Sequence, residues 1–296
     1  MFNTYYSDKI EWLVELLAKK LETNPPSVFE KINISINKFV FGEWVKNQIT
    51  YSNGIFAYCE IKSISDFTNY LVKQIKQNNN KYYWDLESLR WAIIDSLEEL
   101  NEFKEIWPIE FWAKKLKDLH TIDKSLYYFS NNIAKIFLDY LIYRPQIIYG
   151  WHETSINSNS LFCNLEKYEY WQALLFKLIE KKENYSFLTF DILEIIKDID
   201  KKEIISPNIP KEINILTTDD ISSLYIDFYQ KISKFSNINL YIFSPGFNLW
   251  ERTNSIIENN LKSNRKEKNI LIDPIPEIKL GKSSANFQKL IEENGI

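Results

Sequence analysis

The stretch Lys31–Trp44, KINISINKFVFGEW, decides the fold class because a strand pattern gives way to a helix pattern within it. Ile32, Ile34 and Ile36 alternate with polar residues, which predicts a β-strand with one apolar face. From Gly42 onward, GEWVKNQIT has a helical pattern. A strand followed by a helix is the repeating unit of α/β folds with a parallel sheet, and similar units flank this stretch.

The chain on either side predicts an opening order of α-β-α-β-α. Apolar residues at helical spacing run from Ile10 to Leu21, and the sequence Asn-Pro-Pro at 24–26 ends that helix. IFAYCEIK, at 55–62, predicts a second strand, and a helix follows from about Ser65 toward Gln77. Strand patterns return in INILTT, 213–218, and INLYIFSP, 238–245, with the helical segment ISSLYIDFYQKISKF between them.

From Trp84 to about Asp200 the patterns are helical instead. Five helices are predicted there, in LESLRWAIIDSLEEL, IEFWAKKLKDL, SLYYFSNNIAKIFLDYLIYRP, YEYWQALLFKLIEKK and FDILEIIKDID. The simplest architecture is one α/β domain with a parallel sheet, split by an all-helical insertion. The predicted parts are 1–80, 81–205 and 206–296.

Composition favours a folded cytoplasmic protein. Hydrophobic residues make up 45% and aromatic residues 16% of the 296 positions, which excludes the disordered class. The net charge of −4 gives no global signal for nucleic acid. Cys59 and Cys163 lie far apart, so a reducing compartment is expected. Acidic residues near the start argue against a signal peptide, and no apolar run is long enough to span a membrane.

The first candidate motif in the sequence is a phosphate-binding loop. Gly281–Ser283 repeats the Gly-Lys-Ser core of that loop, but Pro276 stands where its first glycine is required. We expect a helix start capped by Ser283 instead. After the first strand, Phe39–Phe41 occupy the positions that would meet phosphate, with Gly42 as the glycine nearby. The sequence therefore predicts a nucleotide-domain layout without its nucleotide loop, and no cofactor.

Other patterns resemble catalytic or metal sites more weakly. Asp219 and Asp220 follow a strand, as in metal-binding Walker B strands, but two residues too late, so one of them is predicted to cap the next helix. DPIPEIK, at 273–279, has the residue types of a nuclease D…E-x-K site with spacing that is too short. With two histidines in the chain, a histidine-based metal site is not expected. Cys59 is predicted to lie mid-strand in the core, and no intrinsic activity is expected.

Arg144, in DYLIYRPQ, stands out because arginine is scarce. One interpretation is an ion-paired arginine at the carboxyl end of a helix, where it also suits the helix dipole. The other is a contact to phosphate or to a partner. Both remain open on the sequence alone.

Segments in order along the chain resemble the RecC family, the gamma subunits of exodeoxyribonuclease V. FLDYLIYRPQIIYGWHE resembles a family helix that ends in Tyr-Leu-x-Tyr-Arg-Pro, followed by a tryptophan and an acidic residue. Weaker matches come from FGEWVKNQI, YWQALLFKLI, LYIFSPGFNLWE and LGKSSANFQKL. Because family subunits are far longer, the chain is expected to be an N-terminal part of one.

The resemblance implies a helicase-like, P-loop NTPase-type sheet that has lost its ATPase motifs. Residues 1–80 and 206–296 then form a 1A-like domain, and 81–205 a 1B-like insertion. It also implies a non-catalytic subunit of a RecBCD-type complex in DNA repair and recombination, with RecB-like and RecD-like motor subunits and forked or single-stranded DNA as partners. The family separates the strands, channels one of them and reads the Chi signal.

The same resemblance selects seven candidate contacts to DNA or a partner: Asn37, Lys38, Phe39, Glu43, Trp44, Lys135 and Arg144. An acidic pair of the family is replaced here by Lys135 and Leu138. The resemblance therefore supports a scaffold role for this chain better than the reading of one particular Chi sequence. Two other functions stay open: an α/β interaction module unrelated to DNA, and an active P-loop ATPase or nuclease.

Overall fold

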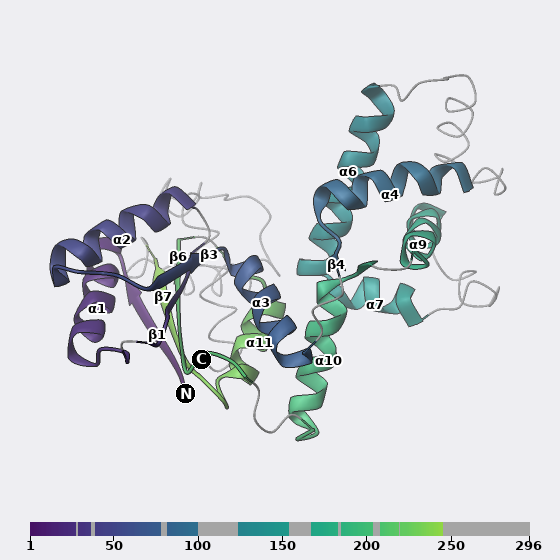
Figure 1. Ribbon diagram of the computed structural model, residues 1–296. Coiled ribbons are helices and arrows are strands. Elements are labelled where there is room, and N and C mark those ends of the chain that lie inside the picture. The colour runs from purple at the N-terminus through teal and green to yellow at the C-terminus, as the bar shows by residue number, and fades with distance from the viewer. Residues whose placement is uncertain are drawn as a thin grey trace, which may run out of the picture. The chain divides into compact units, whose positions relative to one another are not determined.

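A computed structural model of the chain (Figure 1) describes residues 1–27, 29–36, 39–77, 82–99, 124–153, 167–182, 185–203, 208–218 and 220–244. The chain divides into two compact units. The first, here the sheet unit, combines Met1–Lys76 with Asp198–Ile296, and the second, the helical unit, is Gln77–Lys197.

The sheet unit is built on five strands in the order β1-β7-β6-β2-β3, and every pairing between them is parallel. The strands are β1 Phe2–Ser7, β2 Ile32–Ile36, β3 Cys59–Lys62, β6 Glu212–Thr217 and β7 Asn237–Phe243. The helices between them are α1 Ile10–Thr23, α2 Phe39–Asn53, α3 Ile64–Lys76 and α11 Ser223–Ile232. The predicted α/β class with a parallel sheet is confirmed.

Helices cover both faces of this sheet, with α1 and α2 on one side and α3 and α11 on the other (Figure 1). Leu17 of α1 and Ile49 of α2 are fully buried against Ile34 of β2. On the other face, the buried hydroxyls of Thr68 (α3) and Tyr229 (α11) lie 3.0 Å apart in a hydrogen bond. The central strands β2, β6 and β7 are therefore buried on both sides, as is typical of parallel sheets.

Two strand predictions need correction. The predicted opening helix is preceded by β1, whose residues FNTYYS are half-buried and pair with β7 in register from Phe2 opposite Ile238. The strand predicted from Ile55 begins only at Cys59, because Tyr58 has φ of 56°, which no strand residue adopts. Cys59 is thus half-buried at the start of β3 and not mid-strand.

The helical unit packs α4 Leu86–Glu99, α6 Lys124–Tyr143, α7 Pro145–Glu153 and α9 Lys167–Glu180 around one apolar core. Phe190 of α10 Leu188–Asp200 packs against the same core. A short parallel pair, β4 Tyr82–Tyr83 with β5 Tyr185–Ser186, was not predicted. The helix predicted in IEFWAKKLKDL lies outside the described residues. Within the described ranges, no helix is both long and apolar enough to cross a membrane.

Candidate functional site

The connection between β2 and α2 is where a nucleotide domain carries its phosphate loop. Only two residues separate Ile36, the last of β2, from Phe39, the first of α2. Phe39–Phe41, the residues at the positions that would meet phosphate, make the first turn of α2. The P-loop signature places about eight residues between its strand and the body of its helix, so it does not fit here.

Gly42 has a packing role inside α2. A Cβ atom built on Gly42 would lie 2.9 Å from Cγ2 of Ile61 in β3. Real Cβ atoms essentially never approach so closely. Glycine therefore lets α2 lie directly against β3, and its presence after β2 does not indicate phosphate binding.

The candidates on α2 differ in exposure. Glu43 is exposed, whereas Trp44 is half-buried and packs with the core beneath α1 and α2. The ring of Trp44 stacks on that of Phe41, with centroids 5.4 Å apart. Asn37 and Lys38 lie outside the described residues. Trp44 thus offers an edge to a ligand, and Glu43 a full carboxylate.

The segment between β6 and α11 corrects another expectation. The cap of α11 is Ser222, whose hydroxyl accepts a hydrogen bond from the backbone N–H of Tyr225. Asp220 is exposed two residues before this cap, and Asp219 lies outside the described residues. An aspartate cap is therefore wrong: serine fills the position that satisfies a free N–H of the first turn.

Lys135 and Arg144 belong to the helical unit, so the seven candidates do not form one site within a single unit. Lys135 is exposed on α6. Arg144 lies in the one-residue break between α6 and α7; its N–H donates to Tyr140 O at 2.8 Å, and its carbonyl accepts from Ile147 N at 3.1 Å. The side chain is exposed and makes no ion pair with any described residue.

An arginine–aromatic cluster on α4 and α6 was not predicted from the sequence. The guanidinium carbon of Arg90 lies 4.4 Å from the ring centre of Tyr127 and 5.9 Å from that of Trp91. Both rings are partly exposed. Because Trp91 and Tyr127 are 36 residues apart in the chain, only the pairing of the two helices brings them together. Arginine against aromatic faces is a surface that bases can stack on.

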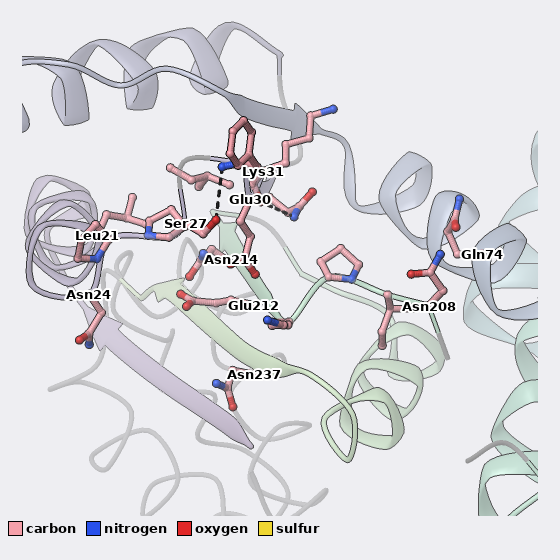
Figure 2. Close-up of a pocket in the computed structure, with 18 of the residues that line it drawn as sticks. Leu21, Asn24, Ser27, Glu30, Lys31, Gln74, Asn208, Glu212, Asn214 and Asn237 are labelled. Carbon is pink, nitrogen blue, oxygen red and sulfur yellow. Dashed lines mark hydrogen bonds between the residues drawn. The ribbon is translucent and has the colours of Figure 1, made fainter. Parts of the chain in front are cut away.

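A cleft of about 520 Å³ opens at the amino ends of β2, β6 and β7, the edge opposite the β2–α2 connection (Figure 2). Leu21 and Asn24, from the end of α1, lie on one side of it. Gln74 of α3 and Asn208 lie on the opposite side. Its lining is Leu21, Asn24, Pro25, Pro26, Ser27, Phe29, Glu30, Lys31, Ile32, Asn33, Tyr70, Gln74, Asn208, Ile209, Pro210, Lys211, Glu212, Asn214 and Asn237. We call it the amino-end cleft.

A row of asparagines crosses three strands beside this cleft. Asn3, Asn239 and Asn214 are in register on β1, β7 and β6. The amide of Asn3 donates to Asn239 at 3.1 Å, and that of Asn239 donates to Asn214 and to Glu212, each at 3.1 Å. Lys20 of α1 donates to the hydroxyl of Tyr5 at 2.5 Å and lies 3.9 Å from its ring centre. Side-chain hydrogen bonds therefore link the three amides of this row across the strands.

The other predicted chemistry is largely outside the described residues, including the segments with Gly281–Ser283 and with 273–279. Within the described ranges, no three histidine, cysteine, aspartate or glutamate side chains are grouped to hold a metal. Partial burial raises the pKa of Cys59, so its thiol is a poor nucleophile.

Comparisons with known proteins agree with the family resemblance. The family described as "RecC, N-terminal domain" matches residues 2–295. The chain is 29% identical over 290 residues to the RecBCD enzyme subunit RecC of Buchnera aphidicola subsp. Acyrthosiphon pisum, covering 93% of this chain and 25% of that relative. It is 22% identical over 290 residues to the subunit of Haemophilus influenzae, with coverages of 90% and 25%. For Escherichia coli the identity is 20% over 259 residues, with coverages of 84% and 22%. The chain spans about a quarter of the length of these relatives.

Proposed function

The chain belongs to the RecC N-terminal domain family, and we propose that it serves as a non-catalytic, DNA-binding and scaffolding part of a RecBCD-type helicase–nuclease. In this role it helps to separate the strands of a broken duplex during double-strand break repair and recombination. It also guides one of the separated strands, in which a Chi-like signal can be read. RecB-like and RecD-like motor subunits are its proposed partners. The family match over 2–295 carries this proposal.

We further propose that the sheet unit descends from a helicase core of the P-loop NTPase type. Support comes from the parallel sheet, whose strands β3 and β6 are separated in the chain by the helical unit. The two-residue β2–α2 connection supports a domain that kept the layout but not the phosphate loop. Motor and nuclease chemistry then belongs to the partner subunits.

The DNA contacts that we propose lie mainly on the helical unit. Arg144 and Lys135 supply exposed cations without a carboxylate partner among the described residues. The exposed rings of Trp91, Tyr128 and Tyr143 supply faces on which unpaired bases can stack. Cations for phosphates together with aromatic faces for bases are the chemistry of a sequence-tolerant single-strand surface.

Fluorescence anisotropy with a labelled DNA fork tests this proposal. We expect tighter binding to the fork than to a blunt duplex, with an affinity that falls as salt is added. Arg144→Gln should weaken binding several-fold and lower the slope of log K against log salt by about 0.7–0.9, the value of one lost phosphate contact. Lys181→Gln, at an exposed lysine just past α9, is the charge-matched control and should leave binding unchanged.

The same titration is repeated on the chain assembled with RecB-type and RecD-type subunits. Absence of salt-dependent fork binding in both settings would contradict the proposal and favour an interaction module unrelated to DNA. Equal losses from Arg144→Gln and Lys181→Gln would refute the assignment of Arg144 as a specific contact.

A further inference from the structure

The amino-end cleft is balanced in charge, unlike a nucleic-acid site. Its charged lining residues are two acids, Glu30 and Glu212, and two bases, Lys31 and Lys211. Lys31 is already engaged, because its ammonium lies 3.0 Å from the carboxylate of Glu60. A polyanion gains its affinity from an excess of cations, and this lining offers none.

Amide side chains dominate the polar part of the cleft. Six of them line it: Asn24, Asn33, Gln74, Asn208, Asn214 and Asn237. An amide carries both donors and an acceptor, as does every peptide unit of an extended chain. Two of the six are fixed in orientation, since Asn33 donates to Lys31 O at 2.9 Å and Asn214 accepts from Asn239 at 3.1 Å. Because these two are buried, the donors and acceptors open to the uncharged N–H and C=O groups of a ligand come mainly from the exposed Asn24, Asn208 and Asn237.

The apolar part of the cleft is rigid and open. Pro25, Pro26 and Pro210 line it, and their fixed φ angles limit the ordering that a ligand must impose. Phe29 lines it with 90% of its surface exposed. Phe29 therefore offers an apolar face to a bound segment beside the amides.

We propose that the amino-end cleft binds an extended, uncharged segment of a partner polypeptide, with an apolar side chain of that segment packed on Phe29. The amides form hydrogen bonds with the main chain of the segment, and the prolines limit the path that the segment can take. This site goes beyond the DNA-contacting role, because it lies in the sheet unit and its chemistry suits peptide and not phosphate. A volume of about 520 Å³ is within the range of pockets that enclose a short ligand segment.

The test uses the ¹⁵N-labelled full chain and capped neutral peptides of about eight serine, threonine and glycine residues with one central leucine or phenylalanine. Weak, residue-specific binding is expected, with Kd roughly 0.1–1 mM. NMR titration should shift the side-chain amide signals of Asn24, Asn208 and Asn237. Phe29→Ala should weaken binding by at least threefold, and a peptide with aspartate in place of the apolar residue should not bind.

Val40→Ala is the matched control for Phe29→Ala. Val40 is 82% exposed, and it lies in the first turn of α2, at the opposite edge of the sheet from the cleft. Neither substitution removes a buried contact, so both variants should fold as the parent does. Peptide binding should survive Val40→Ala unchanged.

Three results would overturn the peptide site. One is the absence of shifts at the cleft amides with every peptide of the panel. Another is equal binding by the parent and Phe29→Ala. The third is oligothymidylate of similar length shifting these amides where the peptides do not, which would make the cleft a nucleic-acid site. Because Arg144→Gln should leave peptide binding intact, failure here and failure of the DNA proposal are separable.

Discussion

Replacing Gly42 by alanine tests the close contact between α2 and β3. The added Cβ would lie 2.9 Å from Cγ2 of Ile61. Overpacking of this kind costs about 1–3 kcal/mol. Alanine in a helix interior recovers about 1 kcal/mol relative to glycine. We therefore expect Gly42→Ala to lower the free energy of unfolding of the sheet unit by about 1 kcal/mol, within a range of roughly 0–2 kcal/mol.

A double-mutant cycle isolates the contact. Ile61→Ala removes Cγ2, so adding Gly42→Ala in that background should stabilise the unit by about 1 kcal/mol. The difference between the two backgrounds gives a coupling energy of about 2 kcal/mol, measured by urea titration followed by circular dichroism. Gly150→Ala is the control, because a Cβ there meets nothing within 4 Å, and it should stabilise the chain by about 0.5–1 kcal/mol. Stabilisation by Gly42→Ala alone, equal to that of Gly150→Ala, would refute the packing role.

Three further predictions concern single interactions of the sheet unit. Ser222→Ala removes the cap of α11 and should cost about 1 kcal/mol, measured by urea titration against Ser222→Asn, which keeps the cap. Tyr229→Phe leaves the ring in place but removes the hydroxyl that bonds Thr68, so a loss of about 0.5–1.5 kcal/mol is expected, and a gain would contradict the bond. Burial acts to raise the pKa of Glu60, but the two lysines bonded to it outweigh this and lower the pKa below its ordinary 4.5. Its contribution to stability is therefore full above pH 4.5 and is lost as the pH falls through the folded-state pKa. Glu60→Gln should flatten that acid decline of the melting temperature, and an unchanged decline would show that Glu60 does not contribute to it.

The parts of the fold that could be predicted are those where one local pattern suffices. β2, β6 and β7 alternate or run apolar, and both of their faces are buried, so their sequences carry the signal of a parallel sheet. β1 carries no such signal, because FNTYYS mixes aromatic and polar residues that remain half-buried. Its place is set by pairing with β7, 236 residues further along the chain, and no local pattern contains that information.

The same limit separates the predicted site residues from the missed ones. Arg144 is a candidate on the sequence alone because it stands beside a proline at the end of a helix in a chain with few arginines. The asparagine row needs Asn3, Asn214 and Asn239 in one register, and that register exists only once three strands have paired. Polar residues at inward positions of strands were the available signal, since a buried amide must find partners. That signal marks positions worth examining but does not say which of them meet.

More than a missing glycine prevents a phosphate loop between β2 and α2. Gly42 holds the first turns of α2 against β3, and only two residues connect that helix to β2. Creating a phosphate cradle would require about six more residues between Ile36 and Phe39 to reach the usual length, and their insertion would have to leave the contact with Ile61 intact. Glu43 would also direct an exposed carboxylate near the same edge, where it would repel phosphate. Because no single substitution removes these obstacles together, this edge of the sheet is suited to packing and surface contacts and not to binding phosphate.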